Sequence, residues 1–381
     1  MRFLWLTWKD RKHPQAGGAE TVNEELAKRL VQGGHEVIIL TSGFKNVPGE
    51  EVTDGYKVIR LGNKWTVYYR AYQYYKKNLQ GWADVVIDEI NTIPFFAKHY
   101  AYEKNILFVH QLCRKVWFYQ MIFPLSVLGY FLEPIYLRLL RDRSVITVSQ
   151  STKNNLMKYG FKDENIKIIS EGIDLEPLES ADEIKKFEKF TILSFGSVRA
   201  MKRTDDIIKA FELAKEKIPR LSLVIAGDFG GGFGRRALKL ARSSKFKKSI
   251  EFCGKVNGER KVELMQKSHL LCAASVKEGW GLVVTEANSQ GTPAVVYDVD
   301  GLRDAVRNGE TGLVCEKNTP ESMAENIVEL YSDKNKYEKL RRSALRWSRE
   351  INFEKSYRDF ETIVSSLCDR PFKSIKQLYY E

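Results

Sequence analysis

Two glutamates, Glu278 and Glu286, stand eight positions apart in the stretch EGWGLVVTE. Glu278 lies in a glycine-containing loop, and a helix is expected to begin near Leu282, so Glu286 would lie about one turn into that helix. Carboxylates accept charge-assisted hydrogen bonds from hydroxyl groups, so the pair is suited to binding a sugar or a ribose. The alternative is that Glu286 only favours the helix dipole and that Glu278 is a solvated loop acid.

Two further loops are suited to binding an anion. The stretch GSVRAMKR, residues 196–203, follows a predicted strand and holds three cations that would clamp a pyrophosphate, unless it is simply an exposed basic loop. Gly17 and Gly18 open the first predicted helix, residues 19–32, where free N–H groups and close backbone approach favour phosphate. A tight turn without a ligand is the alternative there.

Composition limits the class of protein. The chain has 381 residues and a formal net charge of +12, of which the first 170 residues carry +8 (24 basic minus 16 acidic residues). This excess indicates an anionic partner such as phosphate, nucleic acid or anionic lipid. No apolar run reaches the ~20 residues of a membrane span, and neither cysteines nor histidines have metal-ligand spacing. We therefore expect a cytoplasmic protein without a bound metal or other cofactor.

Short apolar strands alternate with helical patterns in both halves of the chain. Continuous Val, Ile and Leu runs are typical of parallel sheets buried on both faces, so we expect a doubly wound α/β fold. A charged break at 171–189 separates residues 1–172, joined by a C-terminal helix at about 353–381, from residues 173–352. Two Rossmann-like domains would then face each other across a cleft, with ligands at the carboxyl ends of the strands. The predicted strands are 3–7, 37–41, 56–61, 84–87, 106–110, 145–149, 166–169, 191–195, 221–226, 250–253, 270–274, 294–297 and 312–314.

The chain resembles family 4 of the glycosyltransferases, which are retaining enzymes of GT-B fold. Its Glu-x7-Glu pattern is met by Glu278 and Glu286, and residues 17–20 (GGAE) and 33–37 (GGHEV) match the family's N-terminal pattern. The resemblance covers essentially the whole chain, with its motifs in the expected order. Segments that look like the family's C-terminal signature are 291–293, 300–302 and 308–313.

The resemblance implies that the second domain binds a nucleotide sugar. Glu278 would bind hydroxyls of the transferred sugar, Glu286 the nucleotide ribose and Lys202 the diphosphate. The family usually has an arginine directly after the loop glycine, where this chain has Ser197. Arg199 would then reach the same phosphates by a different route.

The resemblance also assigns residues around the donor. His110 would lie near the reacting sugar, although a lone histidine at a strand end is more often structural than catalytic. The backbone of Val256 would meet the base, and Gly17 and Gly18 would close over the donor from the first domain. The residues expected to bind the donor are Gly17, Gly18, Gly196, Ser197, Val256, Gly279, Trp280, Gly281, Leu282, Val283 and Glu286.

The implied activity is transfer of a sugar from a UDP- or GDP-linked donor to a glycan or lipid-linked acceptor, with retention of configuration. No side chain is an obvious nucleophile, so the leaving phosphate would accept the acceptor's proton. Two alternatives stay open: a non-catalytic nucleotide-sugar or glycan-binding protein, favoured by Ser197, and a nucleotide-sugar epimerase. Nucleic-acid binding is disfavoured because no groove-reading element is recognisable.

A membrane contact is also predicted. Residues 116–132 carry no charge and six aromatic residues, and residues 104–158 hold eight basic and two acidic residues. Aromatic residues with basic flanks are typical of the headgroup region of anionic membranes, whereas a buried helix with basic ends is the alternative. A second aromatic cluster, 65–75, would line the same face or an acceptor groove. We predict a peripheral enzyme at the inner face of the cell membrane, contacting lipid through residues 104–143.

Overall fold

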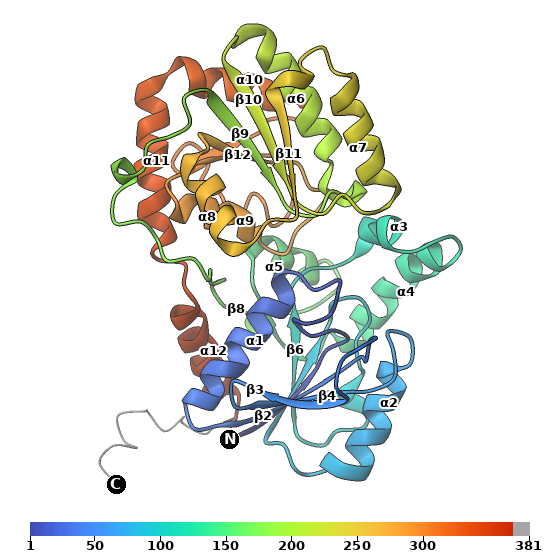
Figure 1. The fold of residues 1–381 in the computed structure, drawn as a ribbon. Coiled ribbons are helices and arrows are strands. Elements are labelled where there is room, and N and C mark those ends of the chain that lie inside the picture. The colour runs from blue at the N-terminus through green and yellow to red at the C-terminus, as the bar shows by residue number, and fades with distance from the viewer. Residues whose placement is uncertain (369–381) are drawn as a thin grey trace. The chain divides into compact units, whose positions relative to one another are not determined.

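The computed structural model describes residues 1–368, apart from the Glu183 side chain. The chain forms two compact units (Figure 1). Unit 1 contains Met1–Gly172 and the C-terminal helix α12 (Phe353–Cys368), and unit 2 contains Ile173–Asn352. The predicted extension of the last helix over residues 369–381 lies outside the described residues.

Unit 1 is built on an eight-stranded sheet with the order β3-β4-β2-β1-β5-β6-β7-β8. All neighbours are parallel except β3 and β4, which pair antiparallel at the edge of the sheet. The strands are β1 (Arg2–Leu6), β2 (Glu36–Thr41), β3 (Glu50–Thr53), β4 (Tyr56–Arg60), β5 (Val85–Glu89), β6 (Lys104–Val109), β7 (Ser144–Thr147) and β8 (Ile166–Ile168).

Strand β3 is the one element of this sheet that our sequence analysis missed. It contains two glutamates and half-exposed side chains, so it lacks the apolar run that marks the buried strands. A two-residue turn, Asp54-Gly55, joins it to β4, and both turn residues have positive φ angles (47° and 85°). Asp-Gly between two extended segments is a strong hairpin signal, so this strand was predictable from its turn.

Helices cover both faces of the unit 1 sheet. On one face, α1 (Gly18–Gln32) and α12 pack against Phe3 and Trp5 of β1, and the ring of Phe360 stacks on Trp5 with centroids 5.8 Å apart. On the other face, side chains of α2 (Val67–Tyr74) and α4 (Leu125–Leu140) form two further apolar clusters. Helix α12, although last in the chain, is therefore part of the unit 1 core. The remaining α-helices of the unit are α3 (Trp117–Gln120) and α5 (Gln150–Met157).

The uncharged run 116–132 forms α3 and the first half of α4, and most of it faces solvent. Phe123 is 79% exposed and Phe131 is 65% exposed, whereas Trp117 packs so closely on Gly129 that a Cβ at that glycine would lie 2.5 Å from the indole. The alternative of a buried helix is therefore wrong for this segment. The large exposed side chains, which we call the α3–α4 apolar face, are Phe118, Tyr119, Ile122, Phe123, Leu125, Leu128, Phe131, Leu132, Ile135 and Leu139.

Unit 2 is a six-stranded parallel sheet with the order β11-β10-β9-β12-β13-β14. Side chains of α6, α7, α10 and α11 form the apolar cluster on one face, and those of α8 and α9 form the cluster on the other. All thirteen strands predicted for the two units are confirmed, with ends that differ by at most two residues. The strands of unit 2 are β9 (Phe190–Phe195), β10 (Leu221–Ala226), β11 (Ile250–Gly254), β12 (Leu270–Ala273), β13 (Ala294–Val296) and β14 (Gly312–Val314). Its helices are α6 (Thr204–Lys217), α7 (Gly231–Ser243), α8 (Gly258–Lys267), α9 (Leu282–Ser289), α10 (Pro320–Ser332) and α11 (Lys334–Ser348).

Within residues 1–368, no helix combines the length and apolar character that crossing a bilayer requires.

Candidate functional site

A small cavity lies at the carboxyl ends of β9 and β12 in unit 2. Four of the predicted site residues line it: Gly196, Lys202, Glu278 and Val283. Residues 196–202 follow β9 directly, and residues 274–283 follow β12 and lead into α9. Because β9 and β12 are parallel neighbours, their carboxyl ends meet at one edge of the sheet and bring these distant segments together.

The Glu278 carboxylate is held by two donors inside this cavity. Its Oε1 lies 2.5 Å from Lys202 Nζ and 2.5 Å from Ser275 Oγ. The Lys202 and Glu278 side chains are 24% and 16% exposed, so both are within reach of a ligand. The backbone around Glu278 is fixed by Gly301, whose φ is +81° and where a Cβ would lie 2.4 Å from the Glu278 carbonyl oxygen. Only glycine tolerates that approach, which gives the segment 300–302 a physical role.

Glu286 has a lysine partner of its own. It lies on the second turn of α9, and its Oε1 is 2.6 Å from Nζ of Lys261 on α8. Burial raises the pKa of Glu286 above its usual value, and the Lys261 ammonium opposes that rise. Lys261 also lies 5.7 Å from the ring centroid of Phe195, which lines the cavity. The two glutamates of the motif are thus each neutralised by one lysine.

Ser275 and Lys261 were not predicted from the sequence. Ser275 lies two residues after β12 and could have been suspected from its place at a strand end. Lys261 is one of 61 basic residues and lies in an ordinary amphipathic helix, so nothing local distinguishes it. Its importance comes from the packing of α8 beside α9.

The basic loop contributes one cation to the cavity, Lys202. The side chain of Arg199 is exposed and does not line the cavity, and Ser197 is exposed beside it. Arg203 pairs with Asp206 at 3.0 Å and lies over the ring of Tyr297. The three cations expected to act together therefore lie in different surroundings: Lys202 lines the cavity, Arg199 faces solvent and Arg203 pairs with Asp206.

The other predicted donor residues lie around the start of α9 and the end of β11. Gly281, with a φ of +104°, caps α9, so the amides of Leu282 and Val283 lack intrahelical partners. Gly279 and Trp280 precede this cap, and the Trp280 ring lies 6.4 Å from that of Trp347. Val256 is half-buried after β11 and packs against the apolar cluster beneath α8 and α9.

In unit 1, His110 lies one residue after β6 and is buried among polar groups. Its Nε2 is 3.2 Å from Oδ1 of Asn23, and the Asn23 amide donates to Oε2 of Glu89 at 2.6 Å. Since the Asn23 amide nitrogen is used by Glu89, its oxygen faces the imidazole, so Nε2 carries the hydrogen and Nδ1 is left as an acceptor. This network orients the ring of His110.

Gly17 and Gly18 lie beside the same network. The Gly17 N–H donates to Oε2 of Glu20 at 2.6 Å, and Oε1 of Glu20 pairs with Lys9 at 3.1 Å. The first turn of α1 therefore already binds a carboxylate of its own chain. Glu89 was missed because the predicted strand ended at residue 87, which placed Asp88 and Glu89 in a loop, whereas β5 continues to Glu89. Glu20 and Asn23 lie in the predicted helix 19–32, and only tertiary packing gives them these partners.

We expect a pH-dependent contribution to stability from Glu89. Burial, with a smaller effect from Glu20, raises the pKa of Glu89 from 4.5 to about 8. The folded chain therefore keeps a proton that the unfolded chain releases, and stability is lost as pH rises from about 4.5 towards 8, by about 1.4 kcal/mol per pH unit. Glu89→Gln should remove this slope. The free energy of unfolding of the variant should therefore rise relative to that of the wild type as pH increases. Denaturant unfolding followed by tryptophan fluorescence measures the difference, because five of the seven tryptophans lie in unit 1.

The exposed Glu36→Gln is the matched control and should leave the slope unchanged. Parallel stability curves for Glu89→Gln and wild type between pH 5 and 8 would contradict the neutral state of Glu89.

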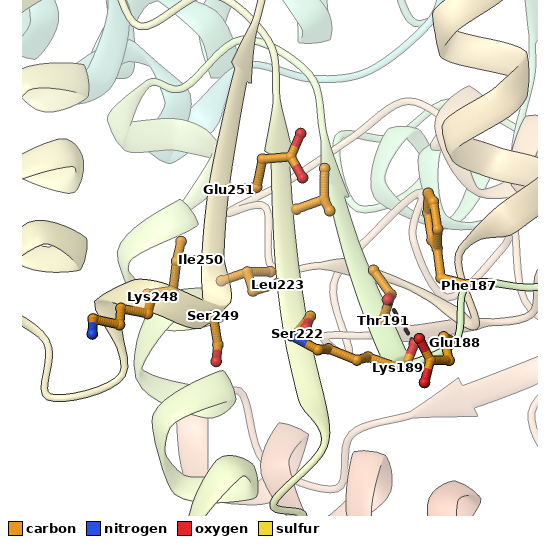
Figure 2. A pocket seen from close by; sticks show the side chains of 11 residues that line it. Phe187, Glu188, Lys189, Thr191, Ser222, Leu223, Lys248, Ser249, Ile250 and Glu251 are labelled. Atoms are coloured by element: carbon orange, nitrogen blue, oxygen red, sulfur yellow. Dashed lines mark hydrogen bonds between the residues drawn. The ribbon is translucent and has the colours of Figure 1, made fainter.

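A second pocket of unit 2, of about 340 Å³, lies at the opposite edge of the sheet (Figure 2). Thr191, Ser222 and Ile250 mark the amino ends of β9, β10 and β11 there. Side chains of both charges, including Lys248 and Glu251, surround it. Ligands of open α/β sheets bind at the carboxyl ends of the strands, whereas this pocket lies at the amino ends. Its lining, taken over residues 1–368, contains none of the predicted site residues, so we assign the pocket no function.

Comparison with known families decides the identity of the chain. The family described as "Glycosyltransferase Family 4" matches residues 16–177, and the family described as "Glycosyl transferases group 1" matches residues 177–347. The chain belongs to the family 4 glycosyltransferases. The boundary between the two matches falls near the division between units 1 and 2. The resemblance inferred from the sequence motifs is thus confirmed.

Two curated relatives of this glycosyltransferase have names that mention different compounds. N-acetyl-alpha-D-glucosaminyl L-malate synthase of Bacillus anthracis is 26% identical over 384 residues, which cover 92% of this chain and 94% of that protein. D-inositol 3-phosphate glycosyltransferase of Rhodococcus jostii is 28% identical over 225 residues, or 56% of this chain. That match spans only 50% of the length of the Rhodococcus protein.

Solved structures similar to this glycosyltransferase have the GT-B fold. Sucrose-phosphate synthase from Thermosynechococcus elongatus has a TM-score of 0.80 at 18% identity, covering 96% of this chain and 98% of that one. HepE of Anabaena, solved in complex with UDP-glucose, has a TM-score of 0.70 at 16% identity, covering 96% and 100% of the two chains. The predicted fold class, two parallel-sheet α/β domains of GT-B type, is confirmed.

Proposed function

We propose that this glycosyltransferase moves a sugar from a nucleotide diphosphate sugar to an acceptor, with retention of configuration. The observation that carries the proposal is the contact of Glu278 with Lys202 and Ser275 in the cavity at the carboxyl edge of unit 2. The HepE structures in complex with UDP and with UDP-glucose support a uridine donor.

The lysine–glutamate pairs suggest how the donor binds. A diphosphate is a stronger partner for Lys202 than a single carboxylate, so the donor would take over this ammonium. Glu278 would then be free to accept a hydrogen bond from a hydroxyl of the sugar, and Glu286, held by Lys261, would accept one from the ribose. Binding is thus an exchange of partners, in which Lys202 moves from the Glu278 carboxylate to the diphosphate and Glu278 from the ammonium to a hydroxyl.

Lys202 would act in the chemical step as well. When the bond between the sugar and the diphosphate breaks, negative charge grows on the leaving phosphate, and a fixed cation beside it lowers the barrier. The leaving phosphate would accept the proton of the attacking acceptor hydroxyl on the same face of the sugar. In unit 1, burial holds the pKa of His110 at about 3, so its ring is neutral and would bind rather than protonate the donor.

Incubation with a panel of UDP- and GDP-linked sugars tests this function. Slow release of UDP or GDP, accelerated by an acceptor, is expected. Nucleotide binding without release would instead identify a non-catalytic binding protein, and an altered sugar still attached to the nucleotide would identify an epimerase.

We further propose that the α3–α4 apolar face rests on an anionic membrane at the inner face of the cell. The ten exposed apolar side chains of this face are typical of an interaction surface. The exposed cations Lys115, Arg138 and Arg141 flank the face, whereas Glu133 is buried and Asp142 is paired with Lys98 at 3.1 Å. Aromatic and aliphatic side chains with cations at their border are suited to the headgroup region of anionic lipid.

The double variant Leu128→Glu/Phe131→Glu should lose membrane binding. Both residues are exposed on α4, and burying each would stabilise the bound state by about 1.5 to 3 kcal/mol, so binding should weaken by more than about tenfold. Flotation with phosphatidylglycerol vesicles at low salt measures the effect. Val52→Glu, on the exposed edge strand β3, is the control and should float like wild type. Equal flotation of the double variant and wild type would rule out this face.

A further inference from the structure

Unit 2 carries a strongly basic stretch that the proposed donor chemistry does not use. Residues 229–250 hold seven basic residues and no acidic residue, so this stretch alone carries +7, against +12 for the whole chain. It forms α7 and the turn Lys247–Ser249 that follows the helix. All seven basic residues are exposed, and we call them the 235–248 basic surface: Arg235, Arg236, Lys239, Arg242, Lys245, Lys247 and Lys248.

The buried side of α7 consists of small residues. Gly234, Ala237 and Ala241 are buried, and the two alanines belong to the apolar cluster that α7 shares with α6. A Cβ at Gly234 would lie 2.1 Å from the carbonyl oxygen of Phe229, so the backbone of the helix approaches its neighbour closely there. Because only small residues face the core, the long basic side chains of the helix project toward solvent.

Most of these cations have no partner within the protein. Arg235, Lys239 and Arg242 follow one another at spacings of four and three residues, which places them on one face of α7. Among residues 1–368, Lys245 is the one member of the surface with a carboxylate within 4.0 Å, that of Glu216 at 2.7 Å. Six positive charges are therefore left for an anion outside the protein.

The surface offers charge and little else. Within residues 229–250 no large apolar side chain is exposed. Phe233 and Phe246 are half-buried against the apolar cluster, and cations lie over their rings, Arg236 at 5.5 Å and Lys245 at 5.1 Å. Protein partners and single-stranded nucleic acids are typically bound through exposed rings or apolar anchors. The composition therefore favours a partner that is recognised by its charge alone.

A bilayer rich in anionic lipid is such a partner. Its headgroups form a broad negative layer, and helices that carry four to eight Lys or Arg residues are typical of proteins that bind it. The α3–α4 apolar face of unit 1 is proposed above to rest on the same kind of lipid. Residues 229–250 contain no Asn or Gln, the side chains that read adenine in a nucleic acid. Lipid is thus favoured over nucleic acid as the source of the phosphates.

We propose that the 235–248 basic surface binds the headgroups of anionic lipid through charge. The surface belongs to unit 2, so it is separate from the α3–α4 apolar face, and neither contact requires the other. The six unpaired guanidinium and ammonium groups contact lipid phosphates, while the aromatic rings stay in the core. Since no apolar side chain enters the bilayer here, this contact should weaken strongly as salt screens the charges.

Sedimentation of the full chain with vesicles of phosphatidylglycerol and phosphatidylcholine in equal amounts tests this surface. The triple variant Arg235→Gln/Lys239→Gln/Arg242→Gln should bind about 100-fold more weakly at low salt, because each cation near an anionic surface strengthens binding by about fivefold. A rise from about 0.05 to about 0.5 M salt should weaken binding of the wild type more than that of the variant.

A second triple variant, Lys334→Gln/Lys339→Gln/Arg346→Gln, is the matched control. It removes the same charge from exposed residues of α11 in the same unit, and it should bind like wild type. Arg235→Lys/Arg242→Lys, which keeps the charge, should also bind like wild type. Equal binding of the α7 and α11 triple variants would overturn the surface, because only net charge would then matter.

Two further outcomes would contradict the choice of lipid. Equally tight binding to vesicles of phosphatidylcholine alone would exclude recognition by charge. Binding of a DNA duplex that the α7 triple variant loses, with its vesicle binding unchanged, would replace lipid by nucleic acid. The thermal shift caused by UDP should be the same in the α7 triple variant and wild type. The binding that remains in Leu128→Glu/Phe131→Glu should be the salt-dependent part, so failures of this surface, of the α3–α4 apolar face and of the donor site are distinguishable.

Discussion

Glu278→Gln should reduce sugar transfer by about 100- to 1000-fold while the chain stays folded. The substitution keeps the shape of the side chain but removes the charge that would bind a sugar hydroxyl and that holds Lys202. Loss of one fixed electrostatic contact to the reacting centre has an effect of this size. Release of UDP or GDP from the preferred donor, in the presence of an acceptor, measures it.

Stability should change by no more than about 1 kcal/mol, because both partners of the Lys202–Glu278 pair are partly exposed. Glu316→Gln, an exposed glutamate of the same unit, is the control and should transfer at the wild-type rate. Full activity of Glu278→Gln would contradict the proposed role of Glu278 in binding the transferred sugar.

Lys202→Gln should lower kcat by about 100-fold or more, because the leaving diphosphate loses the cation that lines the cavity. Arg199→Gln should lower it less than about fivefold, because the Arg199 side chain is exposed and solvent screens its charge. Steady-state kinetics of the two variants side by side measures the difference.

The comparison also decides which cation replaces the arginine that the family usually has at the position of Ser197. A larger loss in Arg199→Gln than in Lys202→Gln would show that the loop rearranges when the donor binds. It would thereby contradict the role assigned here to Lys202.

Much of the fold was predictable because its strands are continuous apolar runs, as buried parallel strands must be. The convergence of residues that line the cavity of unit 2 was predictable for a related reason: Gly196, Lys202 and Glu278 each follow a strand, and strand ends converge. Edge strand β3 was not predicted because it buries little side-chain surface and so lacks an apolar run. The Asp-Gly turn, and not its side chains, is the signal that indicates this strand.

The partners of these residues could not be predicted in the same way. Lys261 reaches Glu286 only because α8 packs beside α9, and Asn23 reaches His110 across 87 positions of sequence. Such contacts depend on tertiary packing and leave no local pattern. For residues 116–132 the sequence allowed both a buried and an exposed helix, since hydrophobicity alone does not say whether a neighbouring element covers it.

The position of α12 has a consequence for synthesis of the protein. Phe353 and Phe360 of this helix complete the core around Phe3 and Trp5, which are synthesised long before it. Unit 2, which is continuous in the chain, has all its residues before α12 emerges. The face of the unit 1 sheet that α1 and α12 share therefore stays partly uncovered until α12 is synthesised after unit 2, and the usual order in which the first domain folds first is reversed at its last step.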